Sequence, residues 1–308
     1  MGRLQEGLFC DSLTKEYGGS KGKKALDGLS LDLPSSGVFS LIGMNGAGKT
    51  TLVRILATQL QPTSGRASIN GLDVMKDAGK LRDQIACVPQ EARTAPFMTA
   101  KQTVLSYLLW RGVSYSEASA KAVEALSKVG LGDQVDVFNR KLSGGTKRKV
   151  LVATVLSSEA DVIFLDEPTT GLDPISRRDL WDLLRGLAKD RFVILTTHYL
   201  EEAEQLASTI GILHKGKLIG LGTLDQLRAS VRFQFSLMLP SGQEIPDVKD
   251  GEVTIGSAGQ TQILTNEDEA RDISKTLLEN GGKFSMSRIS LDDIFFRLVH
   301  GAAEEDQR

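Results

Sequence analysis

The stretch Gly43-Met44-Asn45-Gly46-Ala47-Gly48-Lys49-Thr50-Thr51 decides the fold of this chain. Residues 38–42 before it are apolar, and the residues after it place Leu52, Ile55 and Leu56 at helical spacing. The order is therefore strand, glycine loop, helix, which is the context that the phosphate-loop pattern G-x-x-x-x-G-K-[ST] requires. This segment alone predicts an α/β nucleotide-binding fold.

The chemistry of the loop is that of a polyphosphate site. Its glycines let successive backbone N–H groups turn inward around an anion, which also lies at the positive end of the following helix. Lys49 adds a positive charge for the β- and γ-phosphates, and the Thr50 hydroxyl suits Mg²⁺, which prefers hard oxygen ligands. The alternative is a glycine-rich turn with an incidental lysine. The loop residues expected to bind the nucleotide are Asn45, Gly46, Ala47, Gly48, Lys49, Thr50 and Thr51.

Composition sets the broad class of the protein. The 308 residues are enough for one large domain plus a smaller one. Hydrophobic residues make up 41% and charged residues 25%, and the net charge of −2 gives no general attraction to nucleic acid or anionic lipid. No apolar run approaches the roughly 18–20 residues that span a bilayer, and residues 1–6 lack a signal-peptide core. We therefore expect a cytoplasmic protein that reaches a membrane only through a protein partner.

Two further segments are organised around the loop. Residues 4–33 alternate apolar and polar around a break at 18–24, which predicts antiparallel strands. Residues 91–160 carry helical patterns and predict a helical insertion between strands of one nucleotide fold. Tyr17 ends the first antiparallel strand, where an aromatic ring is suited to stack on an adenine, although a strand-end tyrosine also serves ordinary packing.

The insertion contains a second candidate anion site. Ser143, Gly144 and Gly145 precede an apolar helical segment. Glycines at a helix start leave backbone N–H groups open to an anion at the positive end of the helix dipole. The alternative is a capped helix with a tight entry turn, in which Ser143 is the cap. These residues by themselves leave both possibilities open.

Two adjacent carboxylates follow the apolar strand at 162–165. Asp166 and Glu167 stand at its carboxyl end, which is where ligands bind in an open parallel sheet. Because burying two unpaired acids is costly, we expect them to be functional. Asp166 is placed to hold Mg²⁺, and Glu167 is placed to polarise an attacking water.

Other polar residues stand at the ends of neighbouring elements. Gln90 ends the strand at 85–90, and His198 ends the strand at 192–197, where its position beside the carboxylates favours a phosphate contact over a purely packing role. Asp173 directly precedes Pro174, which is the usual pairing at the start of a helix.

The C-terminal part of the chain predicts a second unit. Alternation from Val231 to Leu239 indicates a strand with one buried face, and Asn266 with Glu269 indicates a capping box that starts a helix. We expect a nucleotide-binding domain at 1–229, with its helical subdomain at about 91–160, and a small α+β accessory domain at 230–308 that ends in a loose polar tail from Ala302.

In this order, the motifs resemble those of the ATP-binding cassette (ABC) family over residues 4–229. The matching features are the aromatic Tyr17, the phosphate loop, Gln90 in the Q-loop, the signature at 142–149, Asp166-Glu167, Gly171-Leu172-Asp173 as D-loop, and the switch His198. The resemblance implies an α/β fold of the P-loop NTPase class, the ABC nucleotide-binding domain, with an antiparallel β subdomain and a helical subdomain, plus the small C-terminal α+β domain.

The resemblance also implies an ATPase that uses ATP and Mg²⁺ in a head-to-tail homodimer, or in a heterodimer with a second cassette. ATP on one subunit's phosphate loop would be capped by the other subunit's signature helix. The implied catalytic residues are Lys49, Gln90, Glu167 and His198. The implied metal ligands are Thr50, Gln90 and Asp166. The residues implied to contact nucleotide beyond the phosphate loop are Tyr17, Ser143, Gly144, Gly145 and Asp173.

Within the family, the chain resembles the ABC-2-type, daunorubicin-resistance-like drug-exporter subunits. Thr146 stands where Gln is usual in the signature, and the basic run 147–149 follows it. The resemblance implies a separate membrane permease, contacted by the helical insertion on the cytoplasmic face of the membrane. The alternatives are a soluble cassette ATPase acting on nucleic acid or ribosomes, and a nucleotide switch that does not hydrolyse ATP. The chain lacks the long coiled-coil insertion or second cassette that is usual in the soluble ATPases. The presence of Glu167 and His198 argues against a switch that does not hydrolyse ATP. The transported compound stays open.

Overall fold

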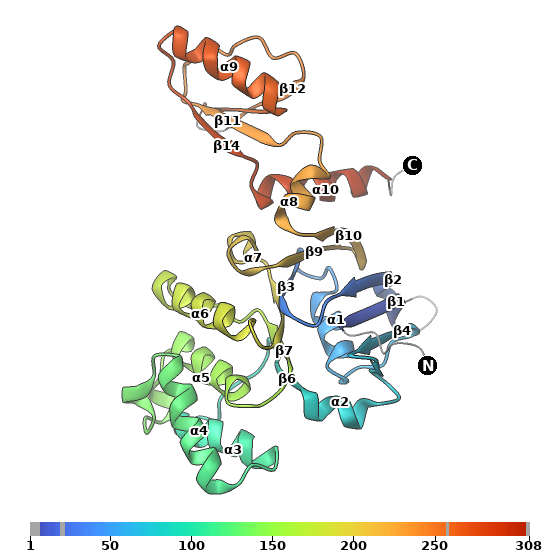
Figure 1. The fold of residues 1–308 in the computed structure, drawn as a ribbon, viewed down its shortest axis with the longest axis vertical. Helices are drawn as coiled ribbons and strands as arrows, with labels where there is room; N and C mark the ends of the chain where they lie inside the picture. The colour runs from blue at the N-terminus through green and yellow to red at the C-terminus, as the bar shows by residue number, and fades with distance from the viewer. Residues whose placement is uncertain (1–6, 19–21, 257–258, 306–308) are drawn as a thin grey trace. The chain divides into compact units, whose positions relative to one another are not determined.

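The computed structural model describes residues 7–18, 22–256 and 259–305, so residues 4–6 and 19–21 of the predicted N-terminal strands and break lie outside the described residues. The chain divides into two compact units, Met1–Leu218 and Ile219–Arg308 (Figure 1). The boundary between these units lies before helix α8 (Leu224–Ala229), whereas the boundary expected at 229 lies after it. The division places α8 in the second unit because α8 packs against α10 (Leu291–Glu305).

A six-stranded sheet forms the centre of the first unit, with the strand order β10-β9-β3-β8-β7-β6. β3 pairs in parallel with β8 and β9, and β7 pairs in parallel with β8 and β6. The inner strands are nearly continuous buried apolar runs, as expected when both faces of a parallel sheet are covered. The strands are β3 (Gly37–Ile42), β6 (Ile85–Val88), β7 (Val162–Asp166), β8 (Phe192–Thr197), β9 (Thr209–His214) and β10 (Lys217–Gly222).

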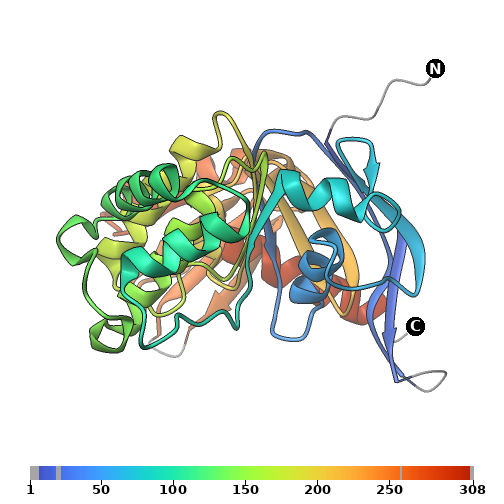
Figure 2. The same ribbon diagram turned by 90° about the horizontal axis from the view of Figure 1, so that it is seen from below.

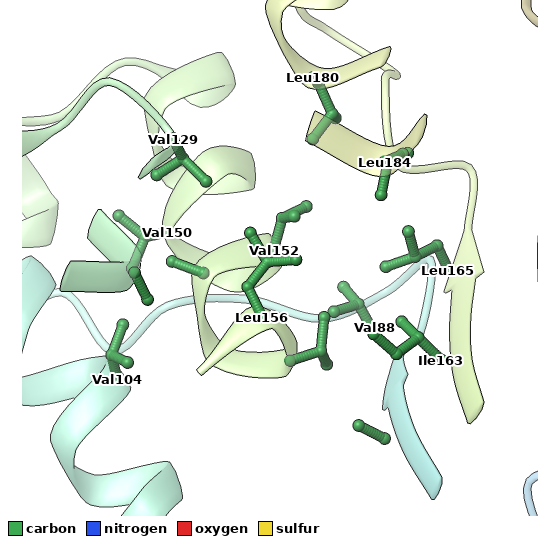
Figure 3. Close-up of a cluster of buried hydrophobic side chains, with 14 of the residues drawn as sticks. Val88, Val104, Val129, Val150, Val152, Leu156, Ile163, Leu165, Leu180 and Leu184 are labelled. Atoms are coloured by element: carbon green, nitrogen blue, oxygen red, sulfur yellow. The ribbon is translucent and has the colours of Figure 1, made fainter. Parts of the chain in front are cut away.

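The two faces of this sheet pack against different layers (Figure 2). Ile163 and Leu165 of β7 join a helical cluster, part of which Figure 3 shows, whereas Val162 and Phe164 join a cluster with α1 and the antiparallel strands. The strand period of two produces this split. The helices on the first side are α3 (Ala100–Trp110), α4 (Tyr115–Lys128), α5 (Gly144–Leu156) and α6 (Pro174–Leu187), and those on the second are α1 (Lys49–Leu56) and α2 (Ala78–Gln84).

The predicted antiparallel strands form a separate four-stranded sheet with the order β2-β1-β4-β5. β1 pairs with β2 from Leu8 opposite Leu33 to Tyr17 opposite Lys23, so Tyr17 stands at the end of the ladder as expected. The strands are β1 (Leu8–Tyr17), β2 (Lys23–Leu33), β4 (Ser64–Ile69) and β5 (Leu72–Asp73). The fold class predicted from the sequence is confirmed, including the helical insertion between β6 and β7.

The second unit is an antiparallel sheet, β12-β13-β11-β14, with helices α8, α9 and α10. One sheet face packs Leu237, Leu239 and Ile263 against α9. Asn266 caps α9 through the Glu269 N–H, but the Glu269 carboxylate accepts from the Asp250 N–H and the Thr265 hydroxyl rather than closing a capping box. The elements are β11 (Phe235–Leu239), β12 (Gly251–Ile255), β13 (Thr261–Thr265), β14 (Ser285–Arg288) and α9 (Glu267–Glu279).

The structure corrects two further expectations in this unit. The strand starts at Phe235 rather than at Val231, because pairing with β13 begins only at Phe235. Val231 and Phe233 are buried as the alternation suggests, but they lie outside the strand. The segment expected to be a loose tail is helical as far as Glu305, where α10 ends. A Ser290–Asp293 exchange, in which each side chain accepts from the other residue's backbone N–H at 3.0 and 3.2 Å, starts that helix. Residues 306–308 lie outside the described part.

Leu126 of α4 is fully buried in the helical cluster, whereas Val123 of the same helix is exposed. We expect Leu126→Ala to lower the free energy of unfolding by about 2–5 kcal/mol, because it removes buried methyl groups and leaves a cavity. Val123→Ala, the matched control, should change it by less than about 0.5 kcal/mol. Urea unfolding followed by circular dichroism measures both, and equal effects of the two substitutions would contradict the packing described for α4.

Candidate functional site

The candidate site lies at the carboxyl edge of the parallel sheet. Ile42 at the end of β3 pairs with Thr197 of β8, and Asp166 at the end of β7 pairs with Thr196. The loops that follow these strands therefore leave the sheet side by side. They border a hollow of about 440 Å³. Its lining residues are Tyr17, Lys23, Ala25, Asn45, Gly46, Gly48, Lys49, Thr50, Thr51, Gln90 and Glu167.

The phosphate loop requires glycine at Gly48. This residue has φ +113°, a left-handed conformation, and a Cβ placed on it would stand 2.2 Å from the Ala25 carbonyl oxygen. Gly48 is also the N-cap of α1, and no side chain caps this helix. The first N–H groups of α1 therefore face the hollow without a side-chain acceptor, as an anion site needs.

Lys49 is buried inside the loop. Its Nζ donates to the carbonyl oxygens of Gly43 at 2.7 Å and Met44 at 3.3 Å. Burial lowers the pKa of Lys49, because desolvation disfavours the ammonium form, while the charges of Glu167 and Asp166 act in the opposite direction. The lysine thus supports the shape of the loop and lies within electrostatic reach of both carboxylates.

Glu167 connects three separate loops. Its Oε1 lies 3.2 Å from His198 Nδ1, and its Oε2 accepts from Gln90 Nε2 at 3.0 Å and from Thr170 Oγ1 at 3.3 Å. The side chain is only 7% exposed, and the residue has φ +54°, which is uncommon for a residue with a Cβ. A strained backbone that the surroundings hold in place is typical of functional positions.

Asp166 is more deeply buried than its neighbour, and its Oδ1 accepts a hydrogen bond from Thr196 Oγ1. Thr196 belongs to β8, so this bond ties the ends of β7 and β8 together. Glu167 therefore contacts both Gln90 and His198, as predicted from the sequence. Asp166, the last residue of β7, lies beside this group.

Tyr17 borders the same hollow from the antiparallel sheet. Its hydroxyl lies 3.5 Å from Thr51 Oγ1, and 44% of its surface is exposed, so the ring is available to a ligand. Sequence analysis did not single out Lys23, the first residue of β2, which lines the hollow and places its Nζ 3.9 Å from where a Gly46 Cβ would stand. A second cation beside a phosphate loop suits a polyphosphate.

Comparison with known proteins decides the family. The daunorubicin/doxorubicin resistance ATP-binding protein DrrA of Streptomyces peucetius is 33% identical, over 97% of this chain and 94% of the relative. The chain belongs to the ABC transporter family. The family model, described as ABC transporter, matches residues 26–170.

Solved structures of ABC cassettes agree with this assignment. The dimeric cassette MJ0796 bound to ADP and Pi superposes with a TM-score of 0.66 at 25% identity, over 70% of this chain and 98% of that one. CbiO1 of Clostridium perfringens, part of the ABC transporter complex CbiONQ, gives a TM-score of 0.64 at 27% identity, over 73% of this chain and 92% of that one. The chain is thus the ATP-binding and ATP-hydrolysing subunit of an ABC transporter.

The ABC signature segment does not line the hollow of its own chain. Ser143 caps α5, accepting from the Thr146 N–H at 3.1 Å, and its hydroxyl lies 2.8 Å from Thr146 Oγ1. A Cβ on Gly145 would stand 3.1 Å from the Gly171 carbonyl oxygen, so the signature and D-loop approach each other closely. Asp173 caps α6 by accepting from the N–H groups of Ile175 and Ser176, which lowers its pKa. The capping roles foreseen for Ser143 and Asp173 are therefore present.

Arg148 is the other site residue that sequence analysis missed, since it was grouped with a basic run. The side chain is buried, and its guanidinium donates to main-chain carbonyl oxygens of Asp166, of Glu167 at 3.0 Å, of Pro168 at 3.4 Å and of Pro89 at 3.3 Å. It holds α5 against the strand end that carries both carboxylates. Arg148 lies four residues before buried Val152, and this helical spacing was a signal that it faces inward.

We expect Arg148→Lys to lower the free energy of unfolding by about 1–3 kcal/mol, because an ammonium cannot reach this set of carbonyl oxygens and leaves buried acceptors unpaired. Lys149→Arg, a conservative change on the next residue, should stay within about 0.5 kcal/mol of the parent. Urea unfolding measures both. An Arg148→Lys protein as stable as the Lys149→Arg control would show that these contacts contribute nothing.

Proposed function

We propose that this ABC subunit hydrolyses ATP at the hollow described above and thereby drives export through a separate membrane permease. One observation carries the site assignment: Glu167, at the end of β7, contacts both His198 and Gln90 and lines the same hollow as the phosphate loop. These are the groups that hydrolysis of a bound triphosphate needs in one place.

Each group has a separate role in this proposal. Glu167 orients and polarises the attacking water, and His198 and Gln90 position the γ-phosphate and the water through the contacts they already make with Glu167. Lys49 and the N–H groups of residues 45–51 stabilise the charge that develops on the phosphate oxygens. Tyr17 stacks on the adenine ring.

The donor set also fits Mg²⁺. Thr50, Gln90 and Asp166 offer only oxygen ligands, which Mg²⁺ prefers, and a nucleotide-linked ion needs just one or two of them besides phosphate. The described residues hold no cluster of three His, Cys, Asp or Glu that would form a metal cage made by the protein alone. When bound, the ion would neutralise phosphate charge and thus favour transfer of the γ-phosphoryl group to water.

A second subunit completes the site in this proposal. Ser143, Gly144 and Gly145 lie at a helix start outside their own hollow, and the related MJ0796 cassette is described as a dimer. We infer that they contact the γ-phosphate bound to the partner subunit, with Asp173 of the D-loop beside them. Donors of this kind are typically worth about 100- to 1,000-fold in rate. The dimer is therefore closed by ATP and loosened by hydrolysis.

The permease docks, in this proposal, on the first unit's helical insertion. A hollow of about 870 Å³ lies between the end of α3 and the start of β6, lined by Tyr107, Trp110, Arg111 and Ile85 among others. Trp110 is 84% exposed there, and in this proposal its ring contacts an apolar side chain of the permease. Strand β6 leads from this hollow directly to Gln90, so the docked segment contacts the element that carries the Q-loop.

A separate permease accords with the described helices, none of which is long and apolar enough to cross a membrane. CbiO1, one of the structural neighbours, is part of a transporter complex. We place this subunit on the cytoplasmic face of the cell membrane, in a homodimer or with a second cassette.

The name of the relative DrrA describes it as a daunorubicin/doxorubicin resistance protein. We therefore propose a hydrophobic drug-like compound as the exported substrate of this subunit. We propose that the first unit is the cassette and that the second unit is its accessory domain.

We expect Glu167→Gln to bind ATP with nearly unchanged affinity and to lose at least about 100-fold in kcat, because the amide cannot polarise water. It should accumulate as an ATP-bound dimer in solution scattering. Glu201→Gln, which changes an exposed carboxylate on α7, is the control and should keep the parental rate. A Glu167→Gln protein that hydrolyses ATP like this control would overturn the assignment of Glu167.

The transporter assignment has its own test. Tagged Glu167→Gln protein with ATP should recover a polytopic membrane protein in stoichiometric amount from detergent-solubilised native membranes, and the same protein without ATP should recover less. Trp110→Ala should reduce this recovery while leaving ATP binding unchanged. Recovery of ribosomes or nucleic acid, with no membrane protein, would contradict the transporter assignment and favour a soluble cassette ATPase.

A further inference from the structure

The interior of the first unit contains a carboxyl group for which the proposed mechanism has no use. Glu202 lies in the first turn of α7 (Leu200–Leu206) and is fully buried. It does not line the nucleotide hollow, so it is not placed to touch ATP. A buried carboxyl is costly unless its surroundings satisfy it, so the position of Glu202 needs a physical reason.

The surroundings of Glu202 come from three elements. From α6, Trp181 Nε1 donates to Glu202 Oε1 at 3.1 Å. From the end of β8 and from the turn after β7, the hydroxyls of Thr197 and Thr169 interact with the same carboxyl. All three partners are themselves buried. Burial raises the pKa of Glu202 because it disfavours the charged form, and these partners and Arg177 act in the opposite direction.

Two of these partners are close in sequence to proposed catalytic residues. Thr197 directly precedes His198, and Thr169 is two residues after Glu167. We propose that Glu202 is a positioning residue that fixes the switch histidine against the catalytic carboxylate by joining the turn after β7, the end of β8 and helix α6. This inference rests on the proposed roles of Glu167 and His198.

The turn around His198 shows how the position is transmitted. The Tyr199 N–H donates to Thr197 Oγ1 at 2.9 Å, and the Tyr199 ring lies 4.1 Å from the His198 ring. The Arg177 guanidinium of α6 lies 4.3 Å from the centre of the Tyr199 ring. Thr197 is therefore the common point of the histidine turn and the Glu202 junction, and α6 supports both.

The junction is not saturated. Glu202 Oε2 and Thr169 Oγ1 each lack a hydrogen bond of good geometry among the described residues. The Thr169 hydroxyl is nevertheless near enough to lower the pKa of the Glu202 carboxyl. An acceptor on α7 and a possible donor in the turn after Glu167 therefore both lack a hydrogen bond. In this proposal, pairing of the two would couple the placement of Glu167 to that of His198.

The test compares Glu202→Ala with Glu202→Gln in the full chain. The amide of Gln keeps the size of the side chain and an oxygen for Trp181, so we expect its kcat to stay within about 3-fold of the parent. Ala removes the junction, and we expect a fall in kcat of about 10- to 100-fold with KM for ATP changed less than about 3-fold, since misplacement of catalytic groups by about 1 Å costs rate rather than binding.

Leu184→Ala is the matched control for loss of packing. Leu184 is fully buried on the same helix α6 as Trp181 but belongs to the apolar cluster. It should lower Tm at least as much as Glu202→Ala while keeping kcat within about 3-fold, with assays run well below both transitions. If Glu202→Ala fails to fold, Trp181→Phe removes the indole donor together with part of the buried ring, and it should lower kcat about 3- to 10-fold at unchanged KM.

Three results would overturn the inference: a kcat loss in Leu184→Ala equal to that in the junction variants, equal losses in Glu202→Gln and Glu202→Ala, or full activity of Glu202→Ala. Glu167→Gln is assayed in parallel to separate the two levels of the argument. If Glu167→Gln remains active, the site assignment itself fails; if it is inactive while Glu202→Ala is fully active, only the positioning role fails.

Discussion

Charged and polar side chains gathered at one edge of a buried parallel sheet are the constraint on which this structure depends. Asp166 and Glu167 at the end of β7, and Lys49 at the start of α1, are all buried, and an unpaired buried charge is energetically costly. The surrounding loops therefore have to supply partners, and they do so from distant parts of the chain: Thr196 for Asp166, and Gln90 and His198 for Glu167. The helical insertion contributes Arg148 to the same edge from the main-chain side. Catalytic geometry and local stability are in this way set by the same contacts.

Sequence alone predicted the parts of the fold whose signal is local. The phosphate loop, the strands that end in Asp166 and His198, and the helices of the insertion follow from apolar runs, glycines and periodicity within short windows. The short strand β14 was missed because its four residues are exposed and show no apolar alternation, and their strand conformation depends on pairing with the distant β11. The helical continuation of α10 to Glu305 was missed because the polar composition there resembles a loose tail.

The candidate site divides along the same line. Residues proposed to bind a phosphate or water were recognisable because they belong to local motifs, whereas residues placed by tertiary contacts were not. Arg148 looked like one member of a basic surface run, and only the structure shows which carbonyl oxygens it reaches. Glu202 looked like one of several acids at a helix start, where acids are favoured in any case. Its burial against Trp181 depends on the packing of α6 and α7, which no short window of sequence encodes.

The strand order has a consequence for how the protein is made. The central strand β3 carries the phosphate loop, yet both of its neighbours come much later in the chain: Gly37 pairs with Phe192 and Phe39 with Thr209. During synthesis, an apolar strand with two open edges must therefore wait for roughly 150 further residues, which at typical elongation rates of about 5–20 residues per second means tens of seconds at the slow end. Contacts this distant in sequence are also slow to form. The nascent nucleotide domain is thus a natural client for chaperones until β8 and β9 emerge.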